Sequence, residues 1–243
     1  MSATRPWFTV EAPGSITSAE ALATSPRHQA YLRWLEPYLS PGVRIWSVGS
    51  GDGIVESVLL ARDHDVLCSD VSIPVPCVVP GNRYVTWDAL SGEPPPREAD
   101  LVLAFSFFFQ WDDATLHAIV GRILQGLAPG GRVVCDVSGS PPTWLARAYH
   151  SGYLPLERWA VLRRHGIRSV RRQHGYLRAT NTLVAAFASH GATLSALEER
   201  HDDIEWRRSI VYNRIRRRWP GIAAVGRWAG RWNPYLRLCT FQR

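Results

Sequence analysis

Short apolar runs alternate with longer amphipathic segments along the first 140 residues. The runs bounded by charged or turn residues are 43–48, 65–70, 83–86, 100–105 and 132–137, and their length predicts β-strands. Helices are predicted between them over 53–62 and 112–127, the latter because apolar side chains recur at helical spacing. Strands that are apolar on both faces and alternate with helices indicate a parallel sheet covered on each side.

The remaining segments complete this picture. Residues 17–39 are predicted to be helical with breaks at Pro26 and Pro37, because proline interrupts a helix. After residue 140 we expect a mainly helical stretch, a helix over 177–190 that ends at Gly191, and two last strands over 192–198 and 235–242. The sequence thus predicts an α/β fold with a doubly wound, mostly parallel seven-stranded sheet. A helical lid over residues 1–39 precedes one domain over 40–243, in which cap or insertion helices occupy about 141–190 and 204–232.

A glycine-rich turn follows the first predicted strand. The segment VRIWSVGSGDG places Gly49, Gly51 and Gly53 between that strand and the next helix. Glycines here allow a tight turn and close backbone approach to a ligand, and the free N–H groups of the helix start face it. The triplet alone also fits a dinucleotide fold or a plain turn. A dinucleotide site is disfavoured because the spacing G-x-G-x-x-G is absent.

Two acidic residues stand at the ends of the next two predicted strands. Asp70 ends the second strand, where a carboxylate accepts hydrogen bonds from the hydroxyls of a ribose. Asp88 follows the third strand, where it can accept a hydrogen bond from an adenine amino group. Either one alone is more often a turn residue. Because both lie at the edge of the sheet that carries the glycine turn, together they indicate a nucleoside site.

The order of SVGSGDG, CSD, WDAL, ADLVLAFSFFFQW and LQGLAPGGRVVCDVS resembles the class I S-adenosylmethionine-dependent methyltransferases over about residues 40–140. The resemblance implies a Rossmann-like fold and S-adenosyl-L-methionine as cofactor. It places the cofactor's methionine and ribose along the turn, with Asp70 at the ribose and the aromatic segment beside the sulfonium. The cofactor-binding residues so implied are Gly49, Ser50, Gly51, Asp52, Gly53, Asp70, Val71, Asp88, Ala89, Phe105, Ser106 and Phe107.

The sequence departs from the family pattern at two points. An acid usually stands two residues before the first glycine and meets the cofactor's amino group, but here that residue is Ser47. Asp52, inside the turn, is the carboxylate that could partly replace it. The segment between Asp70 and Asp88 is also short and contains three prolines, so the usual second crossover helix is expected to be absent or a single turn.

The motifs leave the methyl acceptor open. The segment after the fourth strand lacks the Asn/Asp-Pro-Pro-aromatic signature of enzymes that methylate adenine or glutamine amino groups. Its phenylalanines suit a sulfonium through cation–π attraction, or they pack on the helix that follows. An oxygen or ring-nitrogen acceptor often needs a base. The candidates are His28 and Tyr31 on the N-terminal helix and His150 or His174 in the cap region, and none is singled out.

Charge is distributed unevenly along the chain. Residues 1–150 carry 10 arginines against 15 acids, whereas residues 151–243 carry 18 against 6, and lysine is absent. Arginine binds phosphate and carboxylate groups well, and the tryptophans at 206, 219, 228 and 232 could stack on nucleic-acid bases. The purely structural alternative is a solvated helical cap with buried tryptophans. The four scattered cysteines predict no metal site, and no run is long enough for a membrane span, so a cytoplasmic protein without a stable membrane anchor is expected.

Three functional hypotheses follow from these patterns. The leading one is a biosynthetic methyltransferase for a small molecule, which includes anionic and lipid- or phosphate-linked acceptors. The second is an RNA methyltransferase that uses the arginine-rich half to bind the backbone, although no appended RNA-binding motif is visible. The third is a non-catalytic protein that retains the cofactor pocket. The sequence does not determine the oligomeric state.

Overall fold

The computed structural model describes residues 26–72, 77–137, 180–200, 210–222, 224 and 236–243. Several predictions lie outside these ranges: the helix before residue 26, the helical stretch over 141–175, the candidates His150 and His174, and residues 204–209, 223 and 225–232 of the basic segment. None of the helices within the described ranges has the length and apolar character needed to cross a membrane.

The described part of the chain forms one seven-stranded sheet, in the order β3-β2-β1-β4-β5-β7-β6. Strands β1 to β5 run parallel, and β7 is antiparallel to both of its neighbours, β5 and β6. The predicted mostly parallel, doubly wound sheet is confirmed. The strands are β1 (Arg44–Val48), β2 (Asp65–Asp70), β3 (Tyr84–Thr86), β4 (Ala99–Ala104), β5 (Leu127–Val137), β6 (Thr193–Arg200) and β7 (Leu236–Gln242).

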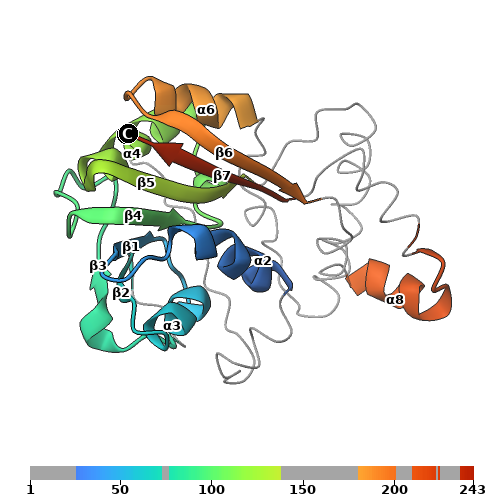
Figure 1. The fold of residues 1–243 in the computed structure, drawn as a ribbon. Helices are drawn as coiled ribbons and strands as arrows, with labels where there is room; N and C mark the ends of the chain where they lie inside the picture. Colours follow the sequence, from blue (N-terminus) through green and yellow to red (C-terminus); the bar gives the residue numbers. More distant parts are fainter. Residues whose placement is uncertain (1–25, 73–76, 138–179, 201–209, 223, 225–235) are drawn as a thin grey trace.

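Helices cover both faces of this sheet (Figure 1). On one face lie α4 (Asp113–Gln125) and α6 (Thr180–Ala188), and on the other α2 (Pro26–Leu35) and α3 (Ile54–Leu60). A further helix, α8 (Ile210–Arg218), stands apart from the sheet. Alternate residues of β1 enter different cores: Trp46 packs on the α4 side and Ile45 on the α2–α3 side, both with no exposed surface. This alternation is what a parallel sheet buried on both faces requires.

The predicted helix over 112–127 is confirmed with shorter bounds. Asp112 is its N-cap, and the carboxylate accepts a hydrogen bond from the backbone N–H of Thr115 at 2.8 Å. A short polar side chain at this position satisfies one of the backbone donors that the first turn leaves without a partner. The helix ends at Gln125, two residues before the predicted limit.

The Pro-Gly-Gly turn predicted before the fifth strand proves to be an irregularity within β5. The strand starts at Leu127, which pairs with Ala99, and pairing resumes at Arg132, which pairs with Leu101. The residues between them bulge out, with Gly130 at a φ of 73°. The sequence signal for a local turn was therefore right, but the strand continues on both sides of it.

The connection between β2 and β3 is short, as predicted. In its described part, residues 77–83, the regular structure is a single 3-10 turn over Gly81–Arg83. Backbone bonds keep the carboxyl ends of these strands together: the N–H of Trp87 donates to the carbonyl of Asp70 at 2.8 Å. The residues that follow β1, β2 and β3 thus meet at one edge of the sheet, toward which the arrows of β4 and β5 point in Figure 1.

Candidate functional site

The glycine turn connects β1 to α3 with three left-handed residues. Gly49, Gly51 and Gly53 have φ values of 64°, 56° and 77°, a region that side chains with a Cβ rarely adopt. The N–H groups of Gly49 and Ser50 both donate to the carbonyl of Ser69 on β2, at 2.7 and 3.2 Å. The turn is therefore fixed to the neighbouring strand, and its conformation requires glycine.

The three glycines differ in what surrounds them. A Cβ on Gly49 would overlap the ring of Phe107, and one on Gly53 would overlap the side chain of Val79. A Cβ on Gly51 would meet no described atom within 4 Å. Gly49 and Gly53 thus serve close packing, whereas Gly51 faces open space at the tip of the turn. A bare backbone beside open space is what a closely approaching ligand needs.

Asp70 lies directly beside that tip. Its carboxylate accepts hydrogen bonds from the N–H of Val71 at 2.7 Å and from the N–H of Gly51 at 3.3 Å. Burial raises the pKa of this carboxyl above its usual value, and the two backbone hydrogen bonds oppose the shift. On the other side of the turn, the hydroxyl of Tyr84 donates to the carbonyl of Gly51 at 3.2 Å. The second strand therefore ends in an acid that is held against the turn.

The residues after β3 lie at the same edge. One oxygen of Asp88 accepts a hydrogen bond from the N–H of Leu90 at 2.9 Å, the geometry of an Asx turn. Ala89 is buried, 7% exposed, against the core on the α4 side. Asp88 thus plays the local structural part expected of a turn residue.

The aromatic segment after β4 packs on both faces of the sheet. Phe107 packs over Gly49 and, with Phe108, belongs to the core that includes α4. Phe105 instead stacks on Tyr31 of α2, with ring centroids 4.0 Å apart and planes inclined by 6°. Between them Ser106 has a φ of 52°, which is rare for a residue other than glycine. Such strain at the end of a central strand is common at binding sites.

A buried carboxylate, absent from the sequence prediction, holds this segment in place. Asp136 on β5 is 3% exposed and accepts hydrogen bonds from the N–H of Ser106, the hydroxyl of Tyr31 and the guanidinium of Arg27. The last two distances are 2.7 and 2.5 Å. Helix α2 is thereby bonded to the ends of β4 and β5. The strained Ser106 is held by Asp136 at its N–H and by the side-chain amide of Gln110 at its carbonyl.

Of the predicted bases, Tyr31 enters this cluster. Burial raises the pKa of its hydroxyl well above the usual value, because the anion is poorly solvated there, and the charge of Arg27 opposes this shift. The hydroxyl is therefore a hydrogen-bond donor at neutral pH. His28 lies on the same helix, with its ring centroid 6.3 Å from that of Tyr31.

The residue that departs from the family pattern has an acidic neighbour. Ser47 is 2% exposed, and its hydroxyl donates to a carboxylate oxygen of Glu56 on α3 at 2.5 Å. Asp52, the replacement suggested by the sequence, is exposed, and its carboxylate accepts a 3.4 Å hydrogen bond from the N–H of Ile54. Asp52 thus bonds within the turn, whereas the buried acid beside Ser47 is Glu56.

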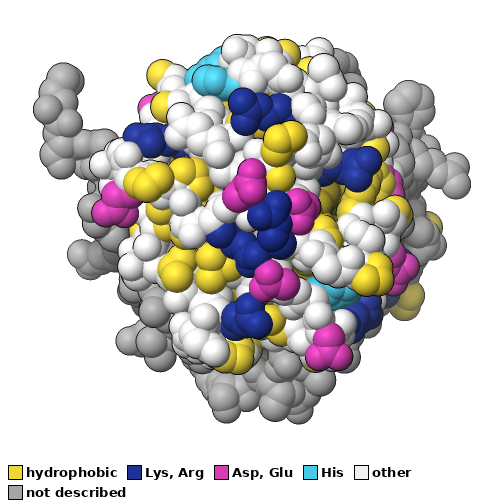
Figure 2. All heavy atoms as spheres, turned by 60° about the vertical axis from the view of Figure 1, so that its left-hand side comes forward, with side chains coloured by type: hydrophobic (Ala, Val, Ile, Leu, Met, Phe, Trp, Pro, Cys, Tyr) yellow, Lys and Arg dark blue, Asp and Glu magenta, His cyan; other side chains and the backbone are white. Residues whose placement is uncertain are grey.

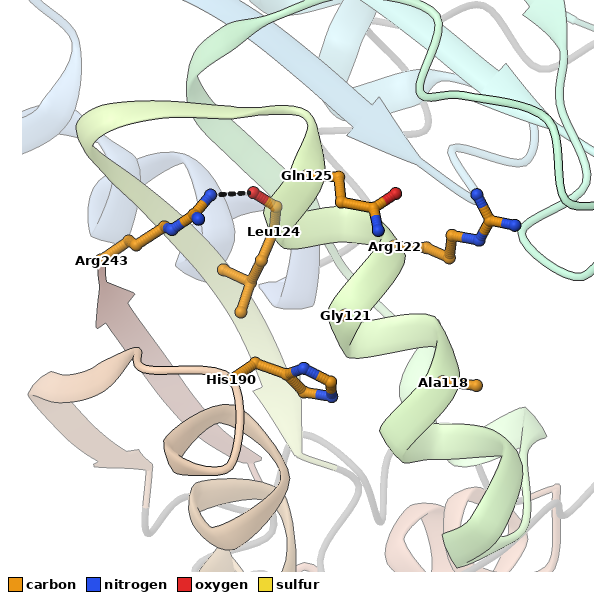
Figure 3. A pocket seen from close by; sticks show the side chains of 7 residues that line it. All are labelled: Ala118, Gly121, Arg122, Leu124, Gln125, His190 and Arg243. Carbon is orange, nitrogen blue, oxygen red and sulfur yellow. Dashed lines mark hydrogen bonds between the residues drawn. The ribbon is translucent and has the colours of Figure 1, made fainter.

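Two other polar features lie away from this edge. One is a hollow of about 320 Å³, lined by residues of α4 together with His190 and Arg243 (Figure 3). The guanidinium of Arg243 donates to the carbonyl of Leu124 at 2.8 Å. At the amino ends of the strands, arginine and acidic side chains interleave (Figure 2). There Arg44 pairs with Asp100 at 2.8 Å and Arg97 with Asp65 at 2.6 Å, so these charges neutralise one another.

No family model matches the chain, and no curated protein is similar to it. Solved structures with the same fold exist. Magnesium protoporphyrin IX methyltransferase from Synechocystis PCC 6803, crystallised with bound SAH, is 13% identical, with a TM-score of 0.54 over 96% of this chain and 90% of that one. A SAM-dependent methyltransferase from Methanosarcina mazei is 14% identical, with a TM-score of 0.58 over 86% and 96%. The [4+2]-cyclase SpnF is 16% identical, with a TM-score of 0.53 over 88% and 82%.

The strand order, the helices on both faces and the glycine turn define a Rossmann-like α/β protein. More closely, the chain has the fold of the class I S-adenosylmethionine-dependent methyltransferases. The resemblance found in the sequence is thus confirmed at the level of the fold. At identities of 13–16% the likeness concerns the fold alone, and the cyclase illustrates that a protein of this fold is also named for other chemistry.

Proposed function

We propose that the protein is an S-adenosylmethionine-dependent methyltransferase. The observation that carries this proposal is the pairing of Asp70 with the open tip of the glycine turn at Gly51. At the carboxyl ends of parallel strands, such a carboxylate can bind the hydroxyls of a ribose. The part of the ligand attached to that ribose can then lie along the partly exposed backbone of the turn. The methyltransferase fold of the solved structures supports the choice of this nucleoside over a dinucleotide.

The residues present fit the cofactor. Asp70 would bind the ribose hydroxyls, Asp88 and Ala89 would border the adenine, and the turn over Gly49–Gly53 would follow the methionine end. When bound, the cofactor supplies an electrophilic methyl group on a sulfonium. The aromatic segment over 105–107, with Ser106 held by Asp136, would border that group and keep water away from it.

For the acceptor we favour a small molecule. The partly exposed ring of Phe105, stacked on the buried ring of Tyr31, would form an apolar wall at the end of β4, and the hydrogen bond from Tyr31 to Asp136 holds that wall in place. Methyl transfer is an in-line displacement, so the task of such a wall is to orient the acceptor and exclude water. We further propose that helix α2 is part of a lid, because its Arg27 and Tyr31 reach the site from the N-terminal side. A base among His28, Tyr31 and His150, and a cytoplasmic location, stay predictions.

Methylation of RNA is the second candidate, favoured by one observation. Helix α8 carries four arginines in its second half, and Trp219, which follows it, is 72% exposed. Cationic side chains beside an exposed indole suit a nucleic-acid backbone and an unstacked base. Transfer of labelled methyl groups to the RNA of a cell extract, with binding that weakens steeply as salt rises, would favour this candidate. Label in the small-molecule fraction would favour the first.

Calorimetric titration with S-adenosylhomocysteine tests the proposed cofactor. We expect micromolar binding by the wild type and a loss of about 1.5–3 kcal/mol in Asp70→Asn, as for hydrogen bonds to a charged group. Asp65→Asn is the matched control, because Asp65 starts the same strand at the opposite edge and pairs with Arg83 and Arg97. Binding without turnover on any acceptor would favour a non-catalytic protein. No binding by the wild type would refute the proposal.

A further inference from the structure

Glu56 is a carboxylate buried in the fold. It is 4% exposed, in the first turn of α3, and its hydrogen-bond donor from another side chain is the hydroxyl of Ser47. Within the described ranges, no arginine or histidine contacts it. Burial raises the pKa of this carboxyl to about 7, and the charge of Asp52 adds to the shift. A neutral hydroxyl compensates only part of the cost of burying a carboxylate.

An acid at this position is costly for the fold alone. The other described residues of that helix face, Val55 and Leu59, are apolar and almost fully buried, so an apolar side chain would suit position 56. Buried carboxylates are usually paired with a cation. The missing counter-charge therefore points to a ligand that brings its own.

The carboxylate lies where the turn begins. Ser47, to which it is bonded, stands two residues before Gly49 and pairs with Cys68 of β2. Glu56 also lies close enough to Cys68 to affect the pKa of its thiol. Burial is the main cause of the rise in that pKa, and the negative charge of Glu56 adds to it. Glu56 thus lies between β1, β2 and α3, on the inner side of the turn, whereas Asp70 lies at its tip.

We propose that Glu56, oriented by Ser47, is the carboxylate that binds the ammonium group at the methionine end of the cofactor. This inference rests on the proposed function. In the family pattern the strand supplies an acid at position 47. Here position 47 is a serine, and the acid is Glu56 on the helix. Glu56 comes nine residues later in the sequence, but its hydrogen bond to Ser47 keeps it beside the end of the same strand. The ligand's ammonium would supply the counter-charge that the described residues do not give Glu56.

The test compares two ligands that differ at that end. S-adenosylhomocysteine carries the amino group, whereas 5′-methylthioadenosine has the same adenosine and thioether without it. In Glu56→Gln we expect the affinity for S-adenosylhomocysteine to fall about 10- to 100-fold, the range for hydrogen bonds to charged groups, and the affinity for methylthioadenosine to change less than about twofold. The matched control is Glu36→Gln, the same chemical change at an exposed residue outside the proposed site, which we expect to lower neither affinity by more than about threefold.

A relocation of the acid gives the second test. The double variant Ser47→Asp/Glu56→Ser returns the carboxylate to the strand, and we expect it to keep most of the preference for S-adenosylhomocysteine over methylthioadenosine. An equal loss for both ligands in Glu56→Gln, or no loss for either, would overturn the assignment while the cofactor proposal stood. Failure of both ligands to bind the wild type would instead refute the proposed function.

Discussion

Replacing Glu56 by glutamine should stabilise the ligand-free protein at alkaline pH. Glutamine has nearly the shape of the acid and retains an oxygen that accepts the hydrogen bond from Ser47, but it carries no charge. In the folded wild type, burial raises the pKa of the Glu56 carboxyl from 4.5 to about 7. Because the anion is disfavoured in the fold, ionisation at this position opposes folding.

The sign and size follow from the linkage between proton binding and stability. An acid whose pKa is raised in the folded state contributes no penalty below its unfolded pKa, and its penalty grows as pH rises from about 4.5 until it levels off above about 7. The rise of the Glu56 pKa from 4.5 to about 7, at about 1.4 kcal/mol for each pH unit, gives roughly 3 kcal/mol. We therefore expect Glu56→Gln to match the wild type near pH 4.5 and to exceed it by up to about 3 kcal/mol at pH 8.

Urea unfolding at several pH values between 4.5 and 8 measures this difference. The control is Glu93→Gln, the same chemical change at an exposed loop residue, for which the difference from wild type should stay small at every pH. A Glu56→Gln protein that is less stable than wild type at pH 8, or a difference that does not vary with pH, would refute the reasoning. Such a result would mean that the carboxylate has a cationic partner in the fold and needs none from a ligand.

Four other substitutions probe the site and its framework. Asp136→Ala leaves the buried Tyr31 hydroxyl and the Arg27 guanidinium without their acceptor, so the free energy of unfolding should fall by about 3–5 kcal/mol in urea titrations; a loss below about 1 kcal/mol would contradict the cluster. Gly49→Ala should lower the free energy of unfolding by about 2–4 kcal/mol, because of the positive φ and the overlap with Phe107. Gly51→Ala should lower it by only about 1 kcal/mol but weaken the binding of S-adenosylhomocysteine. Equal stability losses in the two variants would count against this distinction. Asp112→Ala removes the N-cap of α4 and should lower stability by about 1 kcal/mol in the same titrations; no loss would mean that the cap contributes nothing.

Features encoded over short distances were predictable from the sequence. The alternation of apolar runs and amphipathic segments located the strands, since a sheet buried on both faces needs that pattern, and β2 was predicted at its observed bounds. The glycine turn and Asp70 were also found, because a positive φ demands glycine and the strand end demands a polar residue. The bulge in β5 was interpreted as a turn, because Pro-Gly-Gly specifies local geometry but not whether pairing resumes beyond it.

The cluster around Asp136 was beyond sequence reasoning. Arg27 and Asp136 are 109 residues apart, so their pairing could not be inferred, although an acid inside the apolar run over 133–137 indicated a buried polar contact. Glu56 did leave a signal that was not used: it is the single acid in IVESVLL, a helix otherwise made of apolar residues and one serine. Its meaning depends on the contact with Ser47, which only the packing of α3 on β1 reveals.

A crystal structure of the protein with S-adenosylhomocysteine bound tests the central claim most directly. The account predicts the ribose hydroxyls at the Asp70 carboxylate, the backbone of Gly51 against the ligand, and the ammonium within hydrogen-bond distance of Glu56. An ammonium held elsewhere would remove the role of Glu56 alone. A ligand bound away from the turn over Gly49–Gly53, or a crystal that takes up none at millimolar concentration, would contradict the assignment of this edge of the sheet as the cofactor site.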